Sequence, residues 1–524
     1  MEYTFNRAEY ADSAVLFDGC QEQPLDLDVS LPDYCPDIQR ILKCQVTPCI
    51  LGHSFSGDRL EIDGSVRVRV LYLDSREDTV RCCDMDSGFS AAIPLREPGV
   101  HPCARVSARV EYVNCRAASP RRLDIHGAFS VCALVLDRRI QPICTQAQEE
   151  QLEQRQETAA ASMLAGLGSQ QFTVSETLEI NDSKPPVETI LRSRACCVVQ
   201  DCRPVSGKLL AKGSLRIQVL YASGLDGASL ENMEFEIPFS QMVDCDGAAE
   251  DCRCLLRMEV TDLTLQIRND ANGEAMRLDA EMRISALAQA YRDQEVRFIT
   301  DAYSTEYETQ PDYASLQLTC LDQVIQESIM QKTALEAGGQ PVAQVLDVWN
   351  EMASVTGEIQ NGQLVFSGKM NLCMLAADNQ GAPFYLEKLA DFSLSRPWNE
   401  DVGAGVGKVS CWALVTGLSF RITSNGSVEV SAEISVSGSV FHTISRKMVT
   451  GMHGDETCRK NDGGPALCLY YAAEGESLWD IARSHGVSLR VLCEENGLTD
   501  TDEDRKSTRP ELRHTYQSRM PSSA

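Results

Sequence analysis

Apolar and polar residues alternate in short runs along most of the chain, up to about residue 460. One clear run places Val66, Val68 and Val70 on either side of Arg67 and Arg69. A period of two residues directs one set of side chains to a buried face of a strand and the other set to solvent. Such runs, separated by Gly, Asn and Asp, predict a mainly β protein built from antiparallel β-sandwich-like domains.

One pattern occurs three times, in segments that begin at Pro36, Pro185 and Gln340. Equivalent positions are separated by 149 residues between the first and second copies and by 155 residues between the second and third. The equivalent residues are Leu42, Leu191 and Leu346, then Leu60, Leu209 and Leu364, then Gly64, Gly213 and Gly368. Three sets in one register predict a repeated domain.

Each copy also predicts a hairpin, because an apolar strand is followed by "SGDR", "VSGK" or "QNGQ" and then by a second strand. Asn361-Gly362 in the third copy is typical of a type I′ turn, in which both central residues need a positive φ. We therefore expect β domains at 1–145, 172–319 and 320–455. The segment 146–171 is rich in Gln, Glu and Ala without sustained heptads, and we predict a connecting helix there.

The net charge of −28 and the pI near 4.7 argue against nucleic acid and against an anionic membrane surface, since both need clustered Lys and Arg. No run approaches the ~18 apolar residues of a membrane span. The N-terminal residues have no basic start followed by an apolar stretch, so we expect no signal peptide and no membrane insertion. These features predict a cytoplasmic protein.

The 22 cysteines show no CxxC pair, and most lie in strand-like runs where a thiol is a small apolar side chain. The motif "GAGVGKV" is similar to a phosphate-binding loop, but Val402 replaces its first glycine and Val409 its Ser or Thr. The sequence has no GxSxG and no HExxH motif. We therefore predict no catalytic residues, no metal and no cofactor.

The segment "EGESLWDIARSHGVSLRVLCEENGL" changes to helical spacing after the long β pattern. Ser477 with Asp480 predicts a capped helix start, and Gly486 predicts the end of that helix. Ser488 predicts the start of a second helix, which Asn496-Gly497 ends. After a linker at 456–465, we expect a small α+β module at 466–500 and an atypical polar tail at 501–524.

This module resembles a LysM domain, from its Gly-Glu-Ser-Leu-Trp-Asp-Ile-Ala run to its final Asn-Gly-Leu. The resemblance implies a βααβ fold and, in many members, binding of N-acetylglucosamine polymers such as peptidoglycan or chitin. It places the walls of a binding groove at Glu474, Gly475, Glu476, Ser477 and Leu478 on one side, and at Asn496, Gly497 and Leu498 on the other. Trp479, Ile481 and Ala482 are expected in the core.

The tail departs from the LysM pattern, which continues with a Gly-led closing strand. Without that strand the first strand has no partner for its backbone groups. A substitute strand at about 515–519, an incomplete module and a shifted reading frame remain as alternatives.

The three repeats followed by LysM resemble the SipL-like spore-envelope proteins, which carry SPOCS domains and a LysM domain. "DYCPDIQRIL" and "KPPVETIL" are similar to the usual opening of the SPOCS repeat. The resemblance implies a non-enzymatic adaptor on the mother-cell side of the forespore envelope, whose LysM module docks onto a SpoIVA-type coat scaffold. A peptidoglycan-binding wall or cortex protein is the alternative, and a wall hydrolase would need a catalytic domain that no motif indicates.

Overall fold

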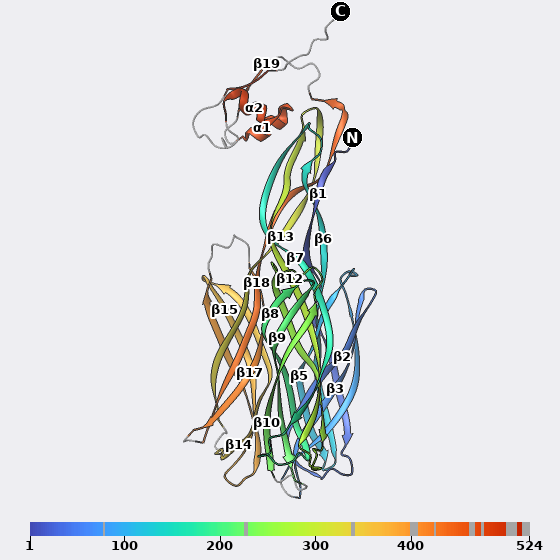
Figure 1. Ribbon diagram of the computed structural model, residues 1–524, viewed down its shortest axis with the longest axis vertical. Coiled ribbons are helices and arrows are strands. Elements are labelled where there is room, and N and C mark those ends of the chain that lie inside the picture. The colour runs from blue at the N-terminus through green and yellow to red at the C-terminus, as the bar shows by residue number, and fades with distance from the viewer. Residues whose placement is uncertain are drawn as a thin grey trace, which may run out of the picture.

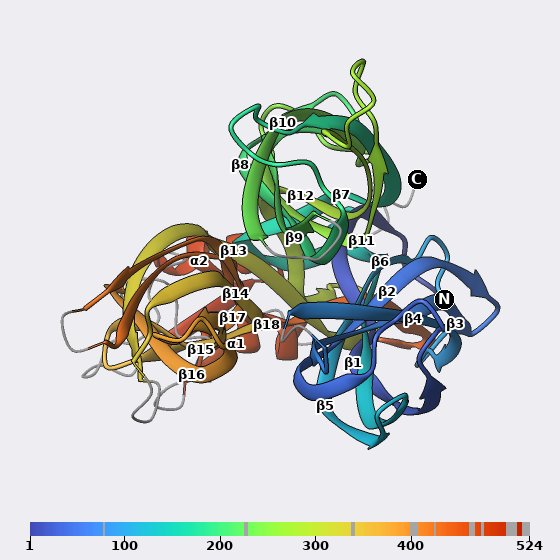
Figure 2. The ribbon, with the colours of Figure 1, turned by 90° about the horizontal axis from the view of Figure 1, so that it is seen from below.

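The computed structural model describes residues 1–76, 79–224, 229–336, 341–398, 407–423, 426–460, 467–472, 476–498 and 511–515. Most of these residues form antiparallel strands, and the strands pair into three units of six. Figure 2 shows the three units side by side around a common axis, and Figure 1 shows that the longest strands continue beyond them as a stalk. The two short helices lie at the far end of that stalk.

The first unit consists of two three-stranded sheets, β2-β3-β4 and β1-β6-β5. Their apolar faces enclose a core that includes Leu60, Val68, Ile125 and Val131, all fully buried. The strands are β1 (Phe5–Ser30), β2 (Ile38–Ser56), β3 (Arg59–Asp74), β4 (Val80–Pro94), β5 (Cys103–Ser119) and β6 (Arg122–Ala147).

The second and third units repeat this arrangement, with sheets β10-β9-β8 and β11-β12-β7, then β14-β15-β16 and β13-β18-β17. The second unit contains β7 (Leu152–Glu179), β8 (Thr189–Val205), β9 (Lys208–Ser223), β10 (Ser229–Asp244), β11 (Arg253–Arg268) and β12 (Arg277–Ser304). The third contains β13 (Tyr307–Leu335), β14 (Gln344–Gln360), β15 (Gln363–Ala377), β16 (Pro383–Pro397), β17 (Lys408–Ile422) and β18 (Val428–Arg459). The prediction of repeated antiparallel β domains is confirmed.

The equivalent glycines occupy equivalent places. Gly64, Gly213 and Gly368 lie in the central strands β3, β9 and β15, each directly opposite a phenylalanine on the next strand. Those phenylalanines are Phe89, Phe239 and Phe392. The ring lies across the glycine and fills the space that a side chain would take, an arrangement that stabilises glycine in a strand.

The equivalent leucines meet at the common axis. Leu42, Leu191 and Leu346 contribute to one apolar cluster that joins all three units. Each lies near the start of the second strand of its unit, so one repeated position supplies the contact surface between repeats. In the stalk, two further clusters also draw residues from all three units, for example Tyr10, Phe298 and Leu318.

The prediction of a helix at 146–171 is wrong. Most of this segment belongs to β7, which pairs with β12 along its whole length. Ala161 and Leu164 are buried in apolar clusters that also contain residues of other units. Tertiary pairing thus overrides the local helix propensity. Strand pairing starts the second unit at β7 and the third at β13, ahead of the expected 172 and 320.

The turn at Asn361-Gly362 has the expected positive φ at both residues, 51° and 68°, between β14 and β15. Most described cysteines are free and at least partly buried, as expected for small apolar side chains. One pair differs from that expectation, because Cys20 and Cys132 face each other on β1 and β6 and form a disulfide. Of the glycine-rich loop, residues 403–406 lie outside the described part, and a strand rather than a helix follows it at Lys408.

Candidate functional site

The C-terminal module has the element order β19 (Leu467–Tyr471), α1 (Leu478–His485), α2 (Leu489–Asn496) and β20 (Glu511–Thr515). Ser477 caps α1, because its Oγ accepts a hydrogen bond from the Asp480 backbone N–H at 3.1 Å and donates to the Asp480 carboxylate at 2.6 Å. Gly486 and Gly497 end the helices in the left-handed conformation, with φ of 62° and 63°. Ser488 occupies the cap position of α2 without a side-chain capping bond.

The polar tail supplies the strand that closes the module. β20 pairs antiparallel with β19, from Leu467 opposite Thr515 to Tyr471 opposite Glu511. Of the three alternatives drawn from the sequence, the structure agrees with a substitute strand, which lies slightly before the expected 515–519. The module therefore has the βααβ arrangement, and neither described helix has the length and apolarity to cross a membrane.

The core of the module contains the residues that the sequence placed there. Trp479, Ile481 and Ala482 are buried, together with Val487 and Leu492. Leu478 and Leu498 are partly buried and pack against the same cluster, so one apolar residue from each expected groove wall contacts a shared core. The helical spacing had correctly identified this inner face.

The expected groove residues fall into two groups. Glu474 and Gly475 lie outside the described residues. Glu476, Ser477, Leu478, Asn496 and Leu498 are half-buried, and Gly497 is exposed.

Hydrogen bonds fix several of these side chains. Tyr470 donates its hydroxyl proton to the Glu476 carboxylate at 2.8 and 2.9 Å, and this bond is the main reason that the pKa of Tyr470 is raised. The Asn496 amide donates to the Leu492 carbonyl at 2.8 Å, which directs it toward its own helix. The described edges of the groove are therefore held in place by local contacts.

The carboxylate of Asp301 is one of the groups that dock the module on the stalk. Asp301 on β12 accepts hydrogen bonds from Trp479 Nε1 at 2.8 Å and from Arg483 Nη1 at 2.9 Å. Tyr313 of β13 donates to the other Asp301 oxygen at 2.6 Å. Charge-assisted bonds of this kind are stronger than neutral ones, so they fix α1 against the stalk.

A buried tyrosine completes the contact. The ring of Tyr303 packs edge-to-face on Trp479, with centroids 4.9 Å apart, and its hydroxyl donates to the Val487 carbonyl at 2.8 Å. Burial raises the pKa of Tyr303, which keeps this donor protonated. Lys460 Nζ donates to the Arg483 carbonyl at 3.0 Å from the other side. The hydrogen bonds of this docking contact use Trp479, Arg483 and Val487, and none of these three is an expected groove residue.

This docking could not be predicted from the sequence. Asp301 and Tyr303 sit in the alternating pattern of β12 like many other strand residues, and they lie far from the helices along the chain. The assignment of Trp479 to the core was correct, but that core also includes Tyr303 of the stalk. Only the tertiary structure brings the two parts together.

Replacing Asp301 with alanine is expected to release the module from the stalk. The substitution leaves the Trp479 and Arg483 donors without their acceptor, at a cost of about 1–3 kcal/mol. We expect faster hydrogen–deuterium exchange in 478–496 and a red shift of tryptophan emission. Asp279→Ala is the matched control. Asp279 lies on β12 like Asp301, but its ion pair with Arg268 is exposed. Unchanged exchange in the Asp301→Ala protein would contradict the docking.

One group of metal-type ligands occurs among the described residues, formed by Glu351, Cys373 and Glu387. Lys43 Nζ lies 3.0 Å from each of the two carboxylates. An ammonium group that already contacts both carboxylates opposes the binding of a second cation. The group is thus best described as an ion-pair network between the first and third units.

Three β units with a βααβ module docked at one end define a multidomain protein of the binding type. Two stretches, 37–118 and 186–268, match the family model described as SipL, SPOCS domain, and they cover β2 to β5 and β8 to β11. Residues 470–502 match the family model of the LysM domain. The chain therefore carries SPOCS domains and a C-terminal LysM domain, which are non-catalytic domain types of sporulation and cell-wall proteins. A search of curated proteins and one of solved structures return no match.

Proposed function

We propose that the chain is a non-enzymatic adaptor of the spore envelope, in which the LysM module binds a SpoIVA-type coat scaffold and the β units bind further proteins. The observation that carries this proposal is the combination of SPOCS and LysM domains, with the LysM module fixed at one end of an elongated body. A docked module presents its groove in one orientation, which suits a protein that joins two layers. The adaptor would act on the mother-cell side of the forespore.

The groove of the module is the proposed binding element. Its walls would be Glu474 to Leu478 and Asn496 to Leu498. Their mixture of a carboxylate, a hydroxyl, exposed backbone at Gly497 and two leucines is suited to a protein segment as well as to a sugar.

The test is binding of the purified SpoIVA-type scaffold to the full-length chain and to a groove variant. Gly497→Trp places a large side chain at an exposed groove position, and we expect it to weaken scaffold binding by about tenfold or more. Gly497→Ala is the matched control, because it places the same strain on the left-handed backbone without the bulk of the indole. Equal binding by all three proteins would exclude the LysM module as the element that binds the scaffold, and would assign that binding to the β units.

A second function is favoured by the LysM match and by the closed βααβ fold, namely binding of peptidoglycan through the same groove. Sedimentation with purified peptidoglycan distinguishes the two functions. Saturable sedimentation of the chain with peptidoglycan, reduced by competing chitin oligomers, would support the glycan function and oppose the adaptor function. We expect no such sedimentation.

A further inference from the structure

A cavity of about 1070 Å³ lies between the three units, and residues of all three line it. β8 starts at the end of its unit away from the stalk, and its part of the lining begins at Ser193, close to Leu191 of the apolar cluster that joins the units. β11 starts at the base of the stalk, where Leu255 belongs to the lining and also packs on a second apolar cluster. The cavity therefore has an apolar cluster at each end.

Polar contacts bridge the seams between the units at the sides. Arg67 Nη1 donates to the Leu263 carbonyl at 2.9 Å between the first and second units. Arg216 Nη1 donates to the Thr416 carbonyl at 2.5 Å between the second and third units. Lys43 and its two carboxylate partners join the third unit to the first. A cavity bordered on its ends and sides by contacts of the protein itself is suited to a small molecule rather than to a polypeptide segment.

Six cationic side chains line the cavity, and five of them form ion pairs with acids. These five are Lys43 with Glu351 and Glu387, Arg67 with Asp86 and Asp262, Arg69 with Asp84, Arg109 with Glu111, and Arg257 with Glu259. The sixth is Arg194, and no acid among the described residues forms an ion pair with it. A charge that is withdrawn from water without a counter-ion is costly, so this guanidinium lacks a natural partner.

A comparison with the neighbouring arginine shows what is missing. Arg192 and Arg194 both reach from β8 to β14 of the third unit, where Arg192 meets the carboxylate of Asp347. Arg194 meets Asn350 instead, and its Nη1 donates to the Asn350 backbone carbonyl at 2.6 Å and to the side-chain oxygen of the same residue. An amide accepts these hydrogen bonds but carries no charge. The contact therefore orients Arg194 without neutralising it.

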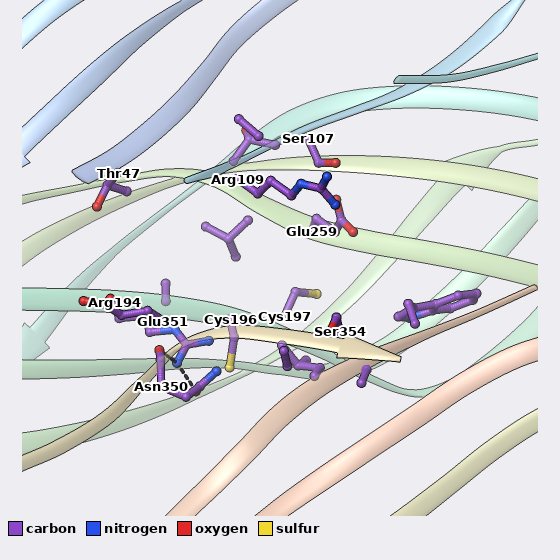
Figure 3. Close-up of a pocket in the computed structure, with 18 of the residues that line it drawn as sticks. Thr47, Ser107, Arg109, Arg194, Cys196, Cys197, Glu259, Asn350, Glu351 and Ser354 are labelled. Carbon is purple, nitrogen blue, oxygen red and sulfur yellow. Dashed lines mark hydrogen bonds between the residues drawn. The ribbon is translucent and has the colours of Figure 1, made fainter. Parts of the chain in front are cut away.

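The free side of Arg194 faces the cavity. Figure 3 shows Arg194 bonded to Asn350 at one wall, while Arg109 and Glu259 lie at the opposite wall. Arg194 is half-buried, and burial lowers its pKa because desolvation disfavours the charged form. An anion in contact with the guanidinium would offset this cost through charge-assisted hydrogen bonds.

The rest of the lining limits which anion fits. Glu351 lies close to Arg194 at the same wall, and its carboxylate would repel a second negative charge on a ligand. Thr47, Ser107 and Ser354 also line the cavity, and their hydroxyl groups can bond to polar groups of a ligand (Figure 3). The volume is at the upper end of ligand sites, which are about 300–1,000 Å³, so it exceeds the needs of an inorganic ion.

We propose that this cavity binds a small organic carboxylic acid that carries one negative charge and further hydroxyl or amide groups. The guanidinium N–H groups of Arg194 that do not face Asn350 would donate to its carboxylate, for which the planar guanidinium is well shaped. The acid would contact both sides of the seam between the second and third units and stabilise it. This site involves no LysM residue, and it does not rest on the adaptor function.

The test measures binding to the full-length chain by isothermal titration calorimetry. The probes are gluconate, glucuronate and N-acetylglycinate, each compared with its uncharged amide. We expect at least one acid to bind saturably and its amide to bind about tenfold or more weakly. Arg194→Gln should weaken binding of that acid by about tenfold or more. Arg109→Gln is the matched control, because it removes the same charge from the opposite wall of the same cavity, and it should bind nearly as tightly as the original chain.

Asn350→Asp separates loss of binding from loss of folding. This variant places a carboxylate of the protein beside Arg194, so it should exclude the acid and weaken binding by about tenfold or more. Its urea midpoint should not fall, because the new charge is paired with the guanidinium.

Other outcomes would overturn the proposal. Equal binding by Arg194→Gln and Arg109→Gln would place the acid elsewhere in the molecule. Binding of inorganic phosphate in preference to all three acids would make the cavity an ion site. Failure of every acid to bind the original chain would mean that Asn350 and the surrounding water are sufficient partners for Arg194.

Discussion

Replacing Asp347 with leucine should lower the free energy of unfolding by about 3–5 kcal/mol, because it leaves a buried guanidinium without its counter-ion. Asp347 on β14 and Arg192 on β8 are each no more than 2% exposed, and Arg192 Nε donates to Asp347 Oδ2 at 2.5 Å. Asn232 donates to the other carboxylate oxygen, and the guanidinium lies over the ring of Trp349 at 4.9 Å. Urea denaturation of the full chain is the measurement.

The double variant Arg192→Met with Asp347→Leu is the matched control. Apolar residues of similar volume in place of both partners are expected to restore stability to near that of the original protein, because no charge then remains buried. If Asp347→Leu were as stable as the double variant, the prediction would be contradicted, because water would then reach the Arg192 guanidinium. Lys43, Arg192 and Asp347 occupy the same position of the repeat in the first, second and third units. Because Arg192 pairs with Asp347, this ion pair also fixes the second unit beside the third.

Gly213→Ala should lower the free energy of unfolding by about 3 kcal/mol, at the upper end of the usual cost of overpacking. A Cβ at this position would lie less than 3.0 Å from the Val198 carbonyl oxygen and 3.1 Å from the Phe239 ring. The carbonyl belongs to the β8 backbone and cannot rotate away as a side chain could. The same substitution at Gly64 or Gly368 meets an equivalent carbonyl and the equivalent phenylalanine.

Gly52→Ala is the control for this prediction. Gly52 also lies in a strand, but nothing is within 4 Å of the position of its Cβ. We expect its urea midpoint to stay close to that of the original protein while the Gly213→Ala midpoint falls. Equal urea midpoints for Gly52→Ala and Gly213→Ala would show that β8 and β9 move apart easily. The repeated glycines would then not be required by the packing of the fold.

Local patterns predicted the parts of the molecule whose structure depends on neighbouring residues. The hairpin turn at Asn361-Gly362 follows from backbone conformation alone, and the start of α1 at Ser477 follows from one side-chain bond to Asp480. The prediction failed at 146–171, where Gln, Glu and Ala favour a helix in isolation. There the pairing partner in β12, more than a hundred residues away, determines the strand.

The candidate site divides in the same way. Spacing identified the inner face of the LysM helices, including Trp479, but it could not show that Asp301 and Tyr303 would receive that face. Likewise, Arg192 and Asp347 are ordinary strand residues in the sequence, and only the packing of the second unit against the third makes them a buried ion pair. Both features come from contacts between segments that are distant along the chain.

The sequence by itself determined that this protein repeats one β unit three times and ends in a LysM module, because periodicity and short motifs record which side chains face inward. The tertiary structure alone decided how the units close around an axis and where the module docks. Those outcomes depend on the pairing of distant strands and on single charged side chains reaching between units, and neither leaves a local pattern in the sequence.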